Sequence, residues 1–263
     1  MSDDITTALT TNENRLGMFA GRVRWYEEVG STNDLVLSWA DAGGEEGLAA
    51  IADTQTNGRG RLGRRWASPP GAGIYLSVLL RPARSVLPLL TLTAGVAVAD
   101  AIESATGLAV ALKWPNDLCV EAGAARWLKL AGILAEAGTS SGANYAIVGM
   151  GINVRTAIYP PDVAARATSL EAELGRAVDR STLVVECLAA LSSRYEQLKG
   201  YGEARILSEW RRRASATLGR SIEFDAEGTM RRGVAQGIDD SGALLVRTTE
   251  GVTRIFSGEV RWL

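Results

Sequence analysis

Residues 48–80, LAAIADTQTNGRGRLGRRWASPPGAGIYLSVLL, decide the fold, because they set two apolar runs on either side of a basic, glycine-rich segment. The runs LAAIAD (48–53) and IYLSVLL (74–80) predict two buried strands. Between them, residues 58–66 hold four arginines and three glycines, and glycines in such numbers weaken a helix or strand. We therefore expect a mobile surface loop between two strands that binds an anion such as a phosphate or nucleotide.

The basic loop has two alternative interpretations. It could be a solvated loop without a ligand, although residues 54–67 contain no acidic side chain to dilute the arginines. It could also contact nucleic acid. The formal net charge of −2, with 46% hydrophobic and 22% charged residues, is typical of a globular protein and not of one that coats nucleic acid.

The composition excludes several kinds of chemistry. The chain has no histidine, which removes Ser-His-Asp and Cys-His nucleophilic sites and HExxH metal sites. Its two cysteines, Cys119 and Cys187, lie too far apart in sequence for a zinc motif and suggest no disulfide framework, so we expect reduced core residues. Arginine, lysine and carboxylate groups must then carry any chemistry.

The N-terminus and one long uncharged segment bear on location. The N-terminal segment MSDDITTALT is acidic where a secretory signal would be basic, which favours a cytoplasmic protein. Residues 85–99 lack charge but include Pro88 and Gly95 and are too short to span a bilayer. We predict a buried helix there and no membrane association.

Outward from the loop, the pattern predicts one large sheet with helices. A strand over 22–29 leads to a helix that Ser31, Thr32 or Asn33 could cap, and an alanine-rich helix covers about 88–106. Strand-like runs follow from Val110 to Val154 and should form a mostly antiparallel or mixed sheet. Further helices are predicted from Ser181 and over 203–213. From residue 218 short strands and turns predict a small all-β barrel.

Three further segments combine unusual residues. Residues 113–117, KWPND, present an amide and a carboxylate beside a proline, although this could be an ordinary hairpin turn. Residues 129–134, KLAGIL, begin an apolar strand with Lys129, which could be only a solvated strand end; Gly132 could be a bulge or a ligand approach. Residues 149–153, GMGIN, follow a buried strand and could form a turn.

Together, these segments resemble the biotin protein ligases. That family carries a Ser-Thr-Asn triplet, a Gln-x-x-Gly-Arg-Gly-Arg-x-Gly-Arg loop, a Lys-Trp-Pro-Asn-Asp turn, a Lys-Leu-x-Gly-Ile-Leu strand and a Gly-Ile-Asn segment. All five stand in this chain, between about Trp25 and Val154. Several linked motifs are far more specific than any one of them.

The resemblance implies an α+β fold. Its catalytic domain, residues 1–214, would resemble class II aminoacyl-tRNA synthetases, with a mixed or antiparallel sheet and helices. Residues 215–263 would form a small SH3-like β-barrel. About twenty residues precede the first predicted strand, so the DNA-binding winged helix of longer members, and with it repressor activity, is not expected.

The resemblance also implies a reaction and its residues. Such an enzyme makes biotinyl-5′-AMP from biotin and MgATP, then transfers biotin to a lysine of a biotin carboxyl carrier domain of an acyl-CoA carboxylase. The expected catalytic residues are Lys129, Arg61 and Asp117. The expected biotin-binding residues are Ser31, Thr32, Asn33, Gln55, Gly58, Arg59, Gly60, Arg61, Lys129 and Gly132. The expected nucleotide-binding residues are Arg61, Arg64, Arg65, Trp66, Asn116, Lys129 and Asn153.

Several alternatives stay open at this point. Mg²⁺ should bridge ATP phosphates, with no protein ligand assigned. The oligomeric state is undetermined, a homodimer included. A lipoate-protein ligase shares the fold and the acyl-adenylate chemistry, but its motif contains a histidine that this chain lacks. A nucleic-acid-binding protein is the rival of another class; its binding would depend steeply on salt.

Overall fold

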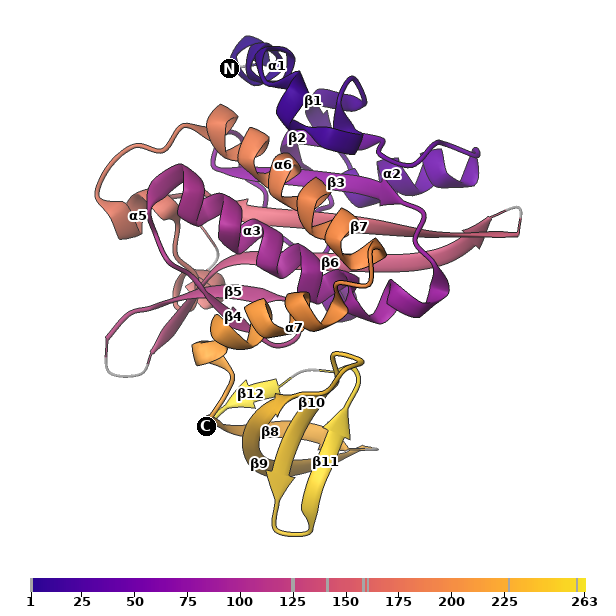
Figure 1. Cartoon of the computed structure of the whole chain (residues 1–263). Helices are drawn as coiled ribbons and strands as arrows, with labels where there is room; N and C mark the ends of the chain where they lie inside the picture. Colours follow the sequence, from indigo (N-terminus) through magenta and orange to yellow (C-terminus); the bar gives the residue numbers. More distant parts are fainter. Residues whose placement is uncertain are drawn as a thin grey trace.

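A seven-stranded mixed sheet forms the larger part of the molecule (Figure 1). The computed structural model describes residues 2–123, 126–140, 142–157, 159, 161–226, 228–258 and 260–263. The strand order is β1-β2-β3-β7-β6-β5-β4; β1 and β2 are parallel and the other pairs antiparallel. The strands are β1 (Val23–Val29), β2 (Ala49–Gln55), β3 (Gly73–Leu80), β4 (Ala111–Lys113), β5 (Asp117–Glu121), β6 (Trp127–Ser140) and β7 (Ala143–Asn153).

Helices cover both faces of this sheet, unequally. The helices are α1 (Ser2–Thr11), α2 (Thr32–Asp41), α3 (Leu90–Thr106), α4 (Pro161–Ala164), α5 (Leu170–Leu174), α6 (Arg180–Lys199) and α7 (Glu203–Arg212). Figure 1 shows α3, α6 and α7 across one face. Ile51 of β2 packs into the core on that side, whereas its neighbour Ala50 packs with Val36 of α2. Adjacent strand residues point to opposite faces, so α2 lies on the other face.

The face that α2 covers is the one with room for a ligand. α2 spans only ten residues, Thr32–Asp41, and packs against β2, β3 and β7. Its start is set by Ser31, whose Oγ accepts from Asp34 N at 3.4 Å and so caps the helix. The rest of that face is bordered by the loop between β2 and β3, which includes residues 58–66.

A second sheet of five strands follows the larger one. Its order is β11-β10-β9-β8-β12, and it packs below α7 in Figure 1. Trp114 joins the two parts: its Nε1 donates to Gly242 O at 3.0 Å, and its backbone N donates to Thr217 Oγ1 at 2.8 Å. The strands are β8 (Ser221–Ala226), β9 (Thr229–Ile238), β10 (Leu244–Thr248), β11 (Gly251–Ile255) and β12 (Val260–Trp262).

The α+β class with a C-terminal β domain is confirmed, and so is the mixed sheet. The segment 84–106 is long and apolar enough to cross a membrane by composition, but 72% of its most apolar window is buried inside the protein. Helix α3, Leu90–Thr106, is therefore the predicted core helix. Cys119 and Cys187 are free and buried, as predicted.

Residues 149–153 continue β7, as the predicted strand-like run to Val154 has it; the alternative of a turn is wrong, because all five residues pair with β3 and residues 149–152 also pair with β6. Two details differed from the prediction. The helix predicted to begin at Ser181 is capped by Asp179, whose carboxylate accepts from Ser181 N at 3.0 Å. Hydrogen bonds from the hydroxyl groups of Ser181 and Thr182 lower the pKa of Asp179. α1 was not predicted; it packs against α6.

Candidate active site

A row of glycines opens a pocket on the face that α2 covers. Gly132 of β6 pairs with Gly151 of β7, and Gly149 lies two residues before Gly151 on β7. A Cβ on Gly151 would stand 2.5 Å from Trp66 Cε2, and one on Gly132 would stand 3.0 Å from Trp66 Cζ3. On Gly149 a Cβ would collide with Asn33 Oδ1. The side chains of Trp66 and Asn33 can therefore lie directly against the sheet only because these three glycine positions carry no side chain.

The floor of the pocket is a network of neutral polar groups. Thr32 N donates to Gln55 Oε1 at 2.8 Å, and Gln55 Nε2 donates to Ser68 Oγ at 2.8 Å. These bonds fix the orientation of the Gln55 amide at the end of β2. Ser31, Thr32 and Asn33 are all buried, each no more than 4% exposed. A buried amide and hydroxyl set amid apolar walls suits an uncharged polar ligand.

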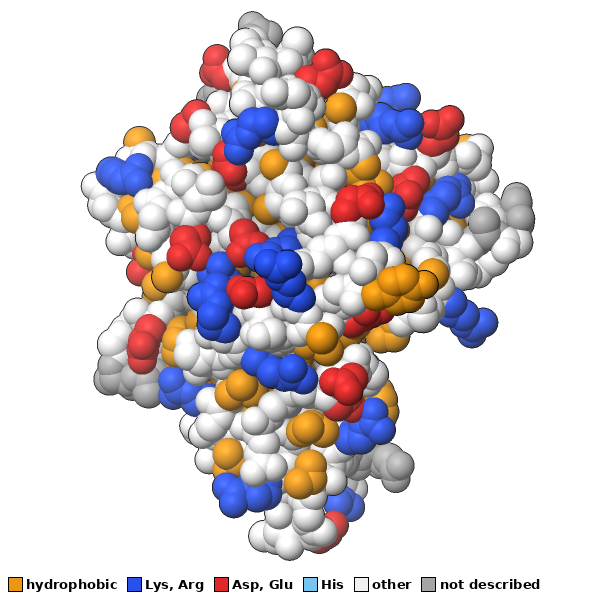
Figure 2. All heavy atoms as spheres, viewed as in Figure 1, with side chains coloured by type: hydrophobic (Ala, Val, Ile, Leu, Met, Phe, Trp, Pro, Cys, Tyr) orange, Lys and Arg blue, Asp and Glu red, His pale blue; other side chains and the backbone are white. Residues whose placement is uncertain are grey.

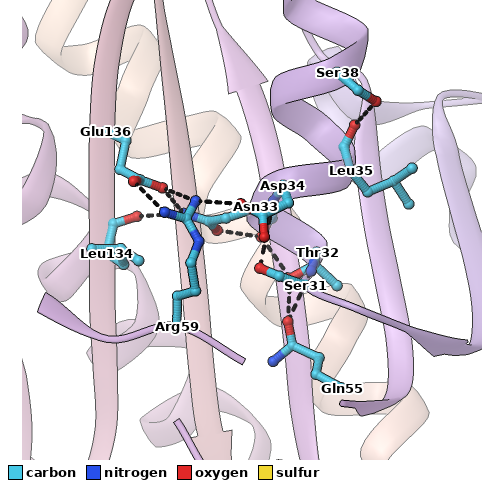
Figure 3. Close-up of polar contacts among 11 residues, drawn as sticks. Ser31, Thr32, Asn33, Asp34, Leu35, Ser38, Gln55, Arg59, Leu134 and Glu136 are labelled. Atoms are coloured by element: carbon cyan, nitrogen blue, oxygen red, sulfur yellow. Dashed lines mark hydrogen bonds and ion pairs between the residues drawn. The ribbon is translucent and has the colours of Figure 1, made fainter. Parts of the chain in front are cut away.

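Asn33 has three hydrogen-bond partners: Ser77, Glu136 and Leu134 O, the last at 3.4 Å; Glu136 and Leu134 are labelled in Figure 3. Its Oδ1 accepts from Ser77 Oγ at 2.6 Å, and its Nδ2 donates to Glu136 Oε2 at 2.8 Å. Ser77, which is fully buried on β3, also lies 2.7 Å from Thr32 Oγ1. Asn33 thus braces the first turn of α2 against the sheet.

Arg59 lies on the same side as Asn33 and is ion-paired. Its Nη1 donates to Glu136 Oε1 at 2.8 Å and its Nη2 to Glu136 Oε2 at 2.6 Å, a bidentate pair (Figure 3). Nη2 also lies 2.8 Å from Asp34 Oδ1. Nε of Arg59 is buried and has no hydrogen-bond partner among the described residues.

Lys129 stands where the pocket meets a larger cleft. Its Nζ forms an ion pair with Asp117 Oδ1 at 2.5 Å and lies 5.2 Å from the centre of the Trp66 ring. The backbone N of Lys129 donates to Arg166 O at 2.8 Å, while Thr168 N donates to Lys129 O at 2.9 Å. These bonds hold the strand end in place on both sides. The lysine is therefore no free, solvated strand terminus.

Arg61 and Asn116, like Lys129, lie where the pocket meets the larger cleft. Arg61 Nη1 lies 3.2 Å from Asn116 Oδ1, and Asn116 Nδ2 donates to Ile133 O at 2.9 Å. Ile133 N in turn donates to Asn116 O at 2.9 Å, so the KWPND turn is tied to β6. The amide of Asn116 is thereby fixed with its oxygen toward the arginine.

The larger cleft runs from the basic loop to the C-terminal sheet. It encloses about 1440 Å³ of space, open solvent included, against about 470 Å³ for the glycine-lined pocket. Gly60, Arg61, Trp66, Asn116 and Lys129 line both. Lining side chains found only in the larger cleft include Arg64, Arg65, Lys113, Asp117, Asn153 and Trp262.

The structure brings most of the predicted residues together, with two exceptions in orientation. Asn153 lines the cleft, but its Nδ2 donates to Thr168 O at 2.9 Å. Arg65 Nη2 donates to Thr56 O at 2.9 Å, back onto its own loop. Gly58 lies beside the pocket and not in its lining; a Cβ there would stand 2.5 Å from Trp66 O.

Three contributors were missed by the sequence analysis: Ser77, Ser68 and Glu136. Ser77 is an isolated hydroxyl in an apolar strand, which is the one signal that could have been noticed. Ser68 and Glu136 have no local signal, because their partners lie far away in sequence.

The thiol of Cys119, which lines the cleft, is poorly suited to nucleophilic chemistry. Burial, together with the charge of nearby Asp117, raises its pKa to about 12. A thiol with a raised pKa stays protonated near neutral pH and is a poor nucleophile. In the described part of the chain no group of three metal-ligating His, Cys, Asp or Glu side chains occurs.

Charges on the helical face alternate in sign. Figure 2 shows basic and acidic side chains intermixed there, and Arg213 pairs with Asp100 and Glu103 at 2.7 Å each. This face carries no continuous basic surface of the kind that phosphate backbones require.

Family models match both parts of the chain. A model described as the biotin/lipoate A/B protein ligase family matches residues 25–153, and one described as the biotin protein ligase C-terminal domain matches residues 217–260. The fold and site thus define a protein ligase of the class that acts on biotin or lipoate.

Relatives narrow the class. The chain is 38% identical to a biotin--[acetyl-CoA-carboxylase] ligase of Paracoccus denitrificans, covering 88% of this chain and 96% of the relative. It is 33% identical to the bifunctional ligase/repressor BirA of Bacillus subtilis, with 96% and 78% covered. The biotin protein ligase of Aquifex aeolicus, solved with biotin and ATP, superposes with a TM-score of 0.79 at 32% identity, covering 92% and 98%. The chain belongs to the biotin protein ligase family.

Proposed function

We propose that the chain is an ATP-dependent biotin protein ligase that forms biotinyl-5′-AMP and then transfers the biotinyl group to a lysine of a biotin carboxyl carrier domain. One observation carries this proposal. A neutral polar pocket and a basic cleft meet at Lys129, Arg61 and Trp66, which line both. An acid held in the pocket would meet a nucleotide held in the cleft at this junction.

The pocket matches the head group of biotin. The ureido ring of biotin is an uncharged urea with two hydrogen-bond donors and one acceptor, and such a group needs neutral partners. Ser31, Thr32 and Gln55 offer hydroxyl and amide groups at the pocket floor. The backbone of residues 58–60 passes beside them and would complete the site. A lipoyl head group has no urea, so the same groups would be left unpaired, at a cost to affinity.

Lys129 and Arg61 would support the first step. The biotin carboxylate attacks the α-phosphorus of ATP, and the bond to pyrophosphate breaks as charge builds on the phosphate oxygens. Fixed cations at that point stabilise the transition state more than the ground state. Arg64, Arg65 and Trp66, with Asn116 and Asn153, form the wall of the cleft that would hold the nucleotide.

Magnesium fits this site as part of the nucleotide. The described residues offer no cluster of three carboxylates, so ATP phosphates would supply its ligands. Bound there, the ion would neutralise phosphate charge.

Asp117 would serve the second step. Lys129 Nζ holds its Oδ1 in the resting site. When the Lys129 ammonium contacts the phosphate of the adenylate instead, the Asp117 carboxylate becomes available to the amine of the incoming lysine. That amine attacks the acyl carbon, AMP leaves, and Asp117 accepts the proton that the amine must lose.

The finer architecture belongs to the same proposal. Residues 1–214 would form a catalytic domain like those of class II aminoacyl-tRNA synthetases, and residues 215–263 an SH3-like barrel. We expect a cytoplasmic enzyme with no nucleic-acid or membrane partner, as a monomer or a homodimer.

Calorimetry with biotin, followed by pyrophosphate release with biotin and ATP, tests the proposal. We expect biotin binding in the micromolar range or tighter, ATP-dependent pyrophosphate release, and no release with lipoate in place of biotin. Release with lipoate alone would overturn the assignment. Salt-dependent binding to single-stranded RNA without a response to biotin would favour the nucleic-acid rival.

A further inference from the structure

Glu136 connects two parts of the biotin pocket that are distant in sequence. It stands on β6, four residues beyond Gly132. Its two carboxylate oxygens accept three hydrogen bonds, two from Arg59 and one from Asn33 (Figure 3). One carboxylate thus holds both the basic loop and the first turn of α2.

Arg59 differs from the other arginines of the loop in its surroundings. The carboxylates of Glu136 and Asp34 both contact the guanidinium of Arg59, and each of its two Nη atoms has a carboxylate partner. An arginine already held by two carboxylates is a weak anion binder, because a phosphate would have to displace them and face their negative charge. Arg64 and Arg65, in contrast, are exposed on the loop tip.

Arg59 also lies at the base of the loop. Trp66 N donates to Gly58 O at 2.9 Å, and Gly60 N donates to Arg64 O at 2.7 Å, so the two ends of the segment are paired. Beyond them, Leu62 adopts φ +57° and is 67% exposed. An anchor at residue 59 therefore fixes the base and leaves residues 61–63, beyond the paired Gly60 and Arg64, as the part able to move.

We propose that Glu136 is a positioning residue: through Arg59 and Asn33 it anchors the base of the basic loop to β6 and α2, so that the biotin pocket stays assembled while the loop tip moves. Arg59 is then the anchor and Arg61 the cation that meets the phosphate. This inference rests on the proposed function, because it assigns the pocket to biotin.

A double-mutant cycle tests it. Glu136→Gln, Arg59→Met and the double variant are compared for biotin Kd by calorimetry and for ATP KM and kcat in pyrophosphate release. Each single change should raise the biotin Kd about tenfold, and the double variant should be no worse than the worse single one, because both remove the same link. ATP KM and kcat at saturating biotin should change by less than about threefold.

A second readout follows the loop directly. Amide hydrogen exchange over residues 58–66 should rise in Glu136→Gln, in the absence of any ligand, while exchange in β3 stays unchanged. Glu196→Gln is the matched control, because Glu196 also pairs with a cation, Lys199 at 2.7 Å, but on the far end of α6. It should leave biotin binding and exchange in the loop unaltered.

Additive losses in the cycle would overturn the inference, since they would mean that Arg59 meets the ligand independently, through Nε for example. An ATP KM that rises tenfold in Arg59→Met would do the same. If Glu136→Gln does not fold, Asp34→Asn with Arg59→Met supplies the same cycle from the other carboxylate. A wild-type chain that binds no biotin would refute the proposed function and not the anchor, which the exchange measurement without ligand reports separately.

Discussion

The glycine-lined pocket and the basic cleft differ in the burial and the charge of the groups that would bind a ligand. In the pocket, Ser31, Thr32 and Asn33 are at most 4% exposed and are held by neighbouring side chains. In the cleft, residues 62–65 are exposed, and Arg64 and Arg65 line it from a loop. The polar groups at the floor of the pocket are thus neutral and buried, whereas the cleft carries charged side chains from an exposed loop.

The difference follows from what each side would bind. A urea ring makes a few directional hydrogen bonds, so a preformed and buried set of partners is worth most. A triphosphate carries charge that acts over several ångströms, so cations on a movable loop suffice and can fold over the ligand. Lys129 belongs to both regions, which is why its loss should cost most.

Lys129→Gln gives the largest expected effect. The variant keeps a polar side chain of similar length but removes the charge next to both the acid and the α-phosphate. We expect pyrophosphate release to fall by roughly 10²–10³-fold. Lys199→Gln, which also breaks an ion pair but lies at the end of α6, is the control and should keep full activity. A Lys129→Gln enzyme within threefold of wild type would show that the two regions do not meet at this residue.

Gly149→Ala should damage the pocket and spare the cleft. The new Cβ would collide with Asn33 Oδ1 and push the first turn of α2 off the sheet. Overpacking of this kind costs about 1–3 kcal/mol, and we expect a loss of biotin affinity of about tenfold with ATP KM changed by less than about threefold.

Gly138→Ala is the matched control on the same strand pair. There a Cβ would stand 2.5 Å from Tyr145 Cζ, a side chain in the same apolar cluster as Ala40 near the end of α2, and neither Gly138 nor Tyr145 lines the pocket. It should lower thermal stability without changing biotin Kd. Equal losses of biotin affinity in both variants would mean that any crowding of β6 and β7 disturbs the pocket.

Ionic strength should affect ligand binding in the two regions differently, without any mutation. Raising ionic strength from about 0.05 M to 0.5 M shortens the screening length to a few ångströms. ATP KM should then rise severalfold, while biotin Kd should stay within about twofold, because only the carboxylate of biotin meets cations and the partners of its ureido ring are neutral and buried. Enzyme assays and calorimetry at matched salt check this. A biotin Kd that weakens as much as ATP KM would contradict a neutral pocket.

The two regions also differed in how far the sequence predicted them. The cleft residues Arg61, Lys129 and Asn116 stand in dense local motifs, and the structure brings them together. The pocket depends on partners distant along the chain: Ser77 reaches Asn33 from 44 residues away, and Glu136 reaches Arg59 from 77. Such contacts depend on strand register, which a single sequence does not specify.

The same limit explains why a turn stayed open as an alternative at residues 149–153. Gly149 and Gly151 left that alternative open because glycine is typical of turns. In the structure they are strand residues that lack side chains so that Asn33 and Trp66 can lie on the sheet. The two roles of glycine look alike in sequence and differ only in what approaches the backbone.

Arg65→Ala should have the smallest effect, and it tests the cleft where the structure and the prediction differ most. Arg65 was expected to bind the nucleotide, yet its Nη2 donates to Thr56 O at 2.9 Å while the side chain is exposed. An exposed arginine that keeps this backbone partner adds only screened, long-range attraction to ATP. We expect ATP KM to rise by no more than about twofold, against severalfold for Arg64→Ala, whose residue lies on the same loop tip. Steady-state pyrophosphate release at low salt measures both. A tenfold rise for Arg65→Ala would mean that the side chain leaves Thr56 when the loop closes and meets a phosphate directly.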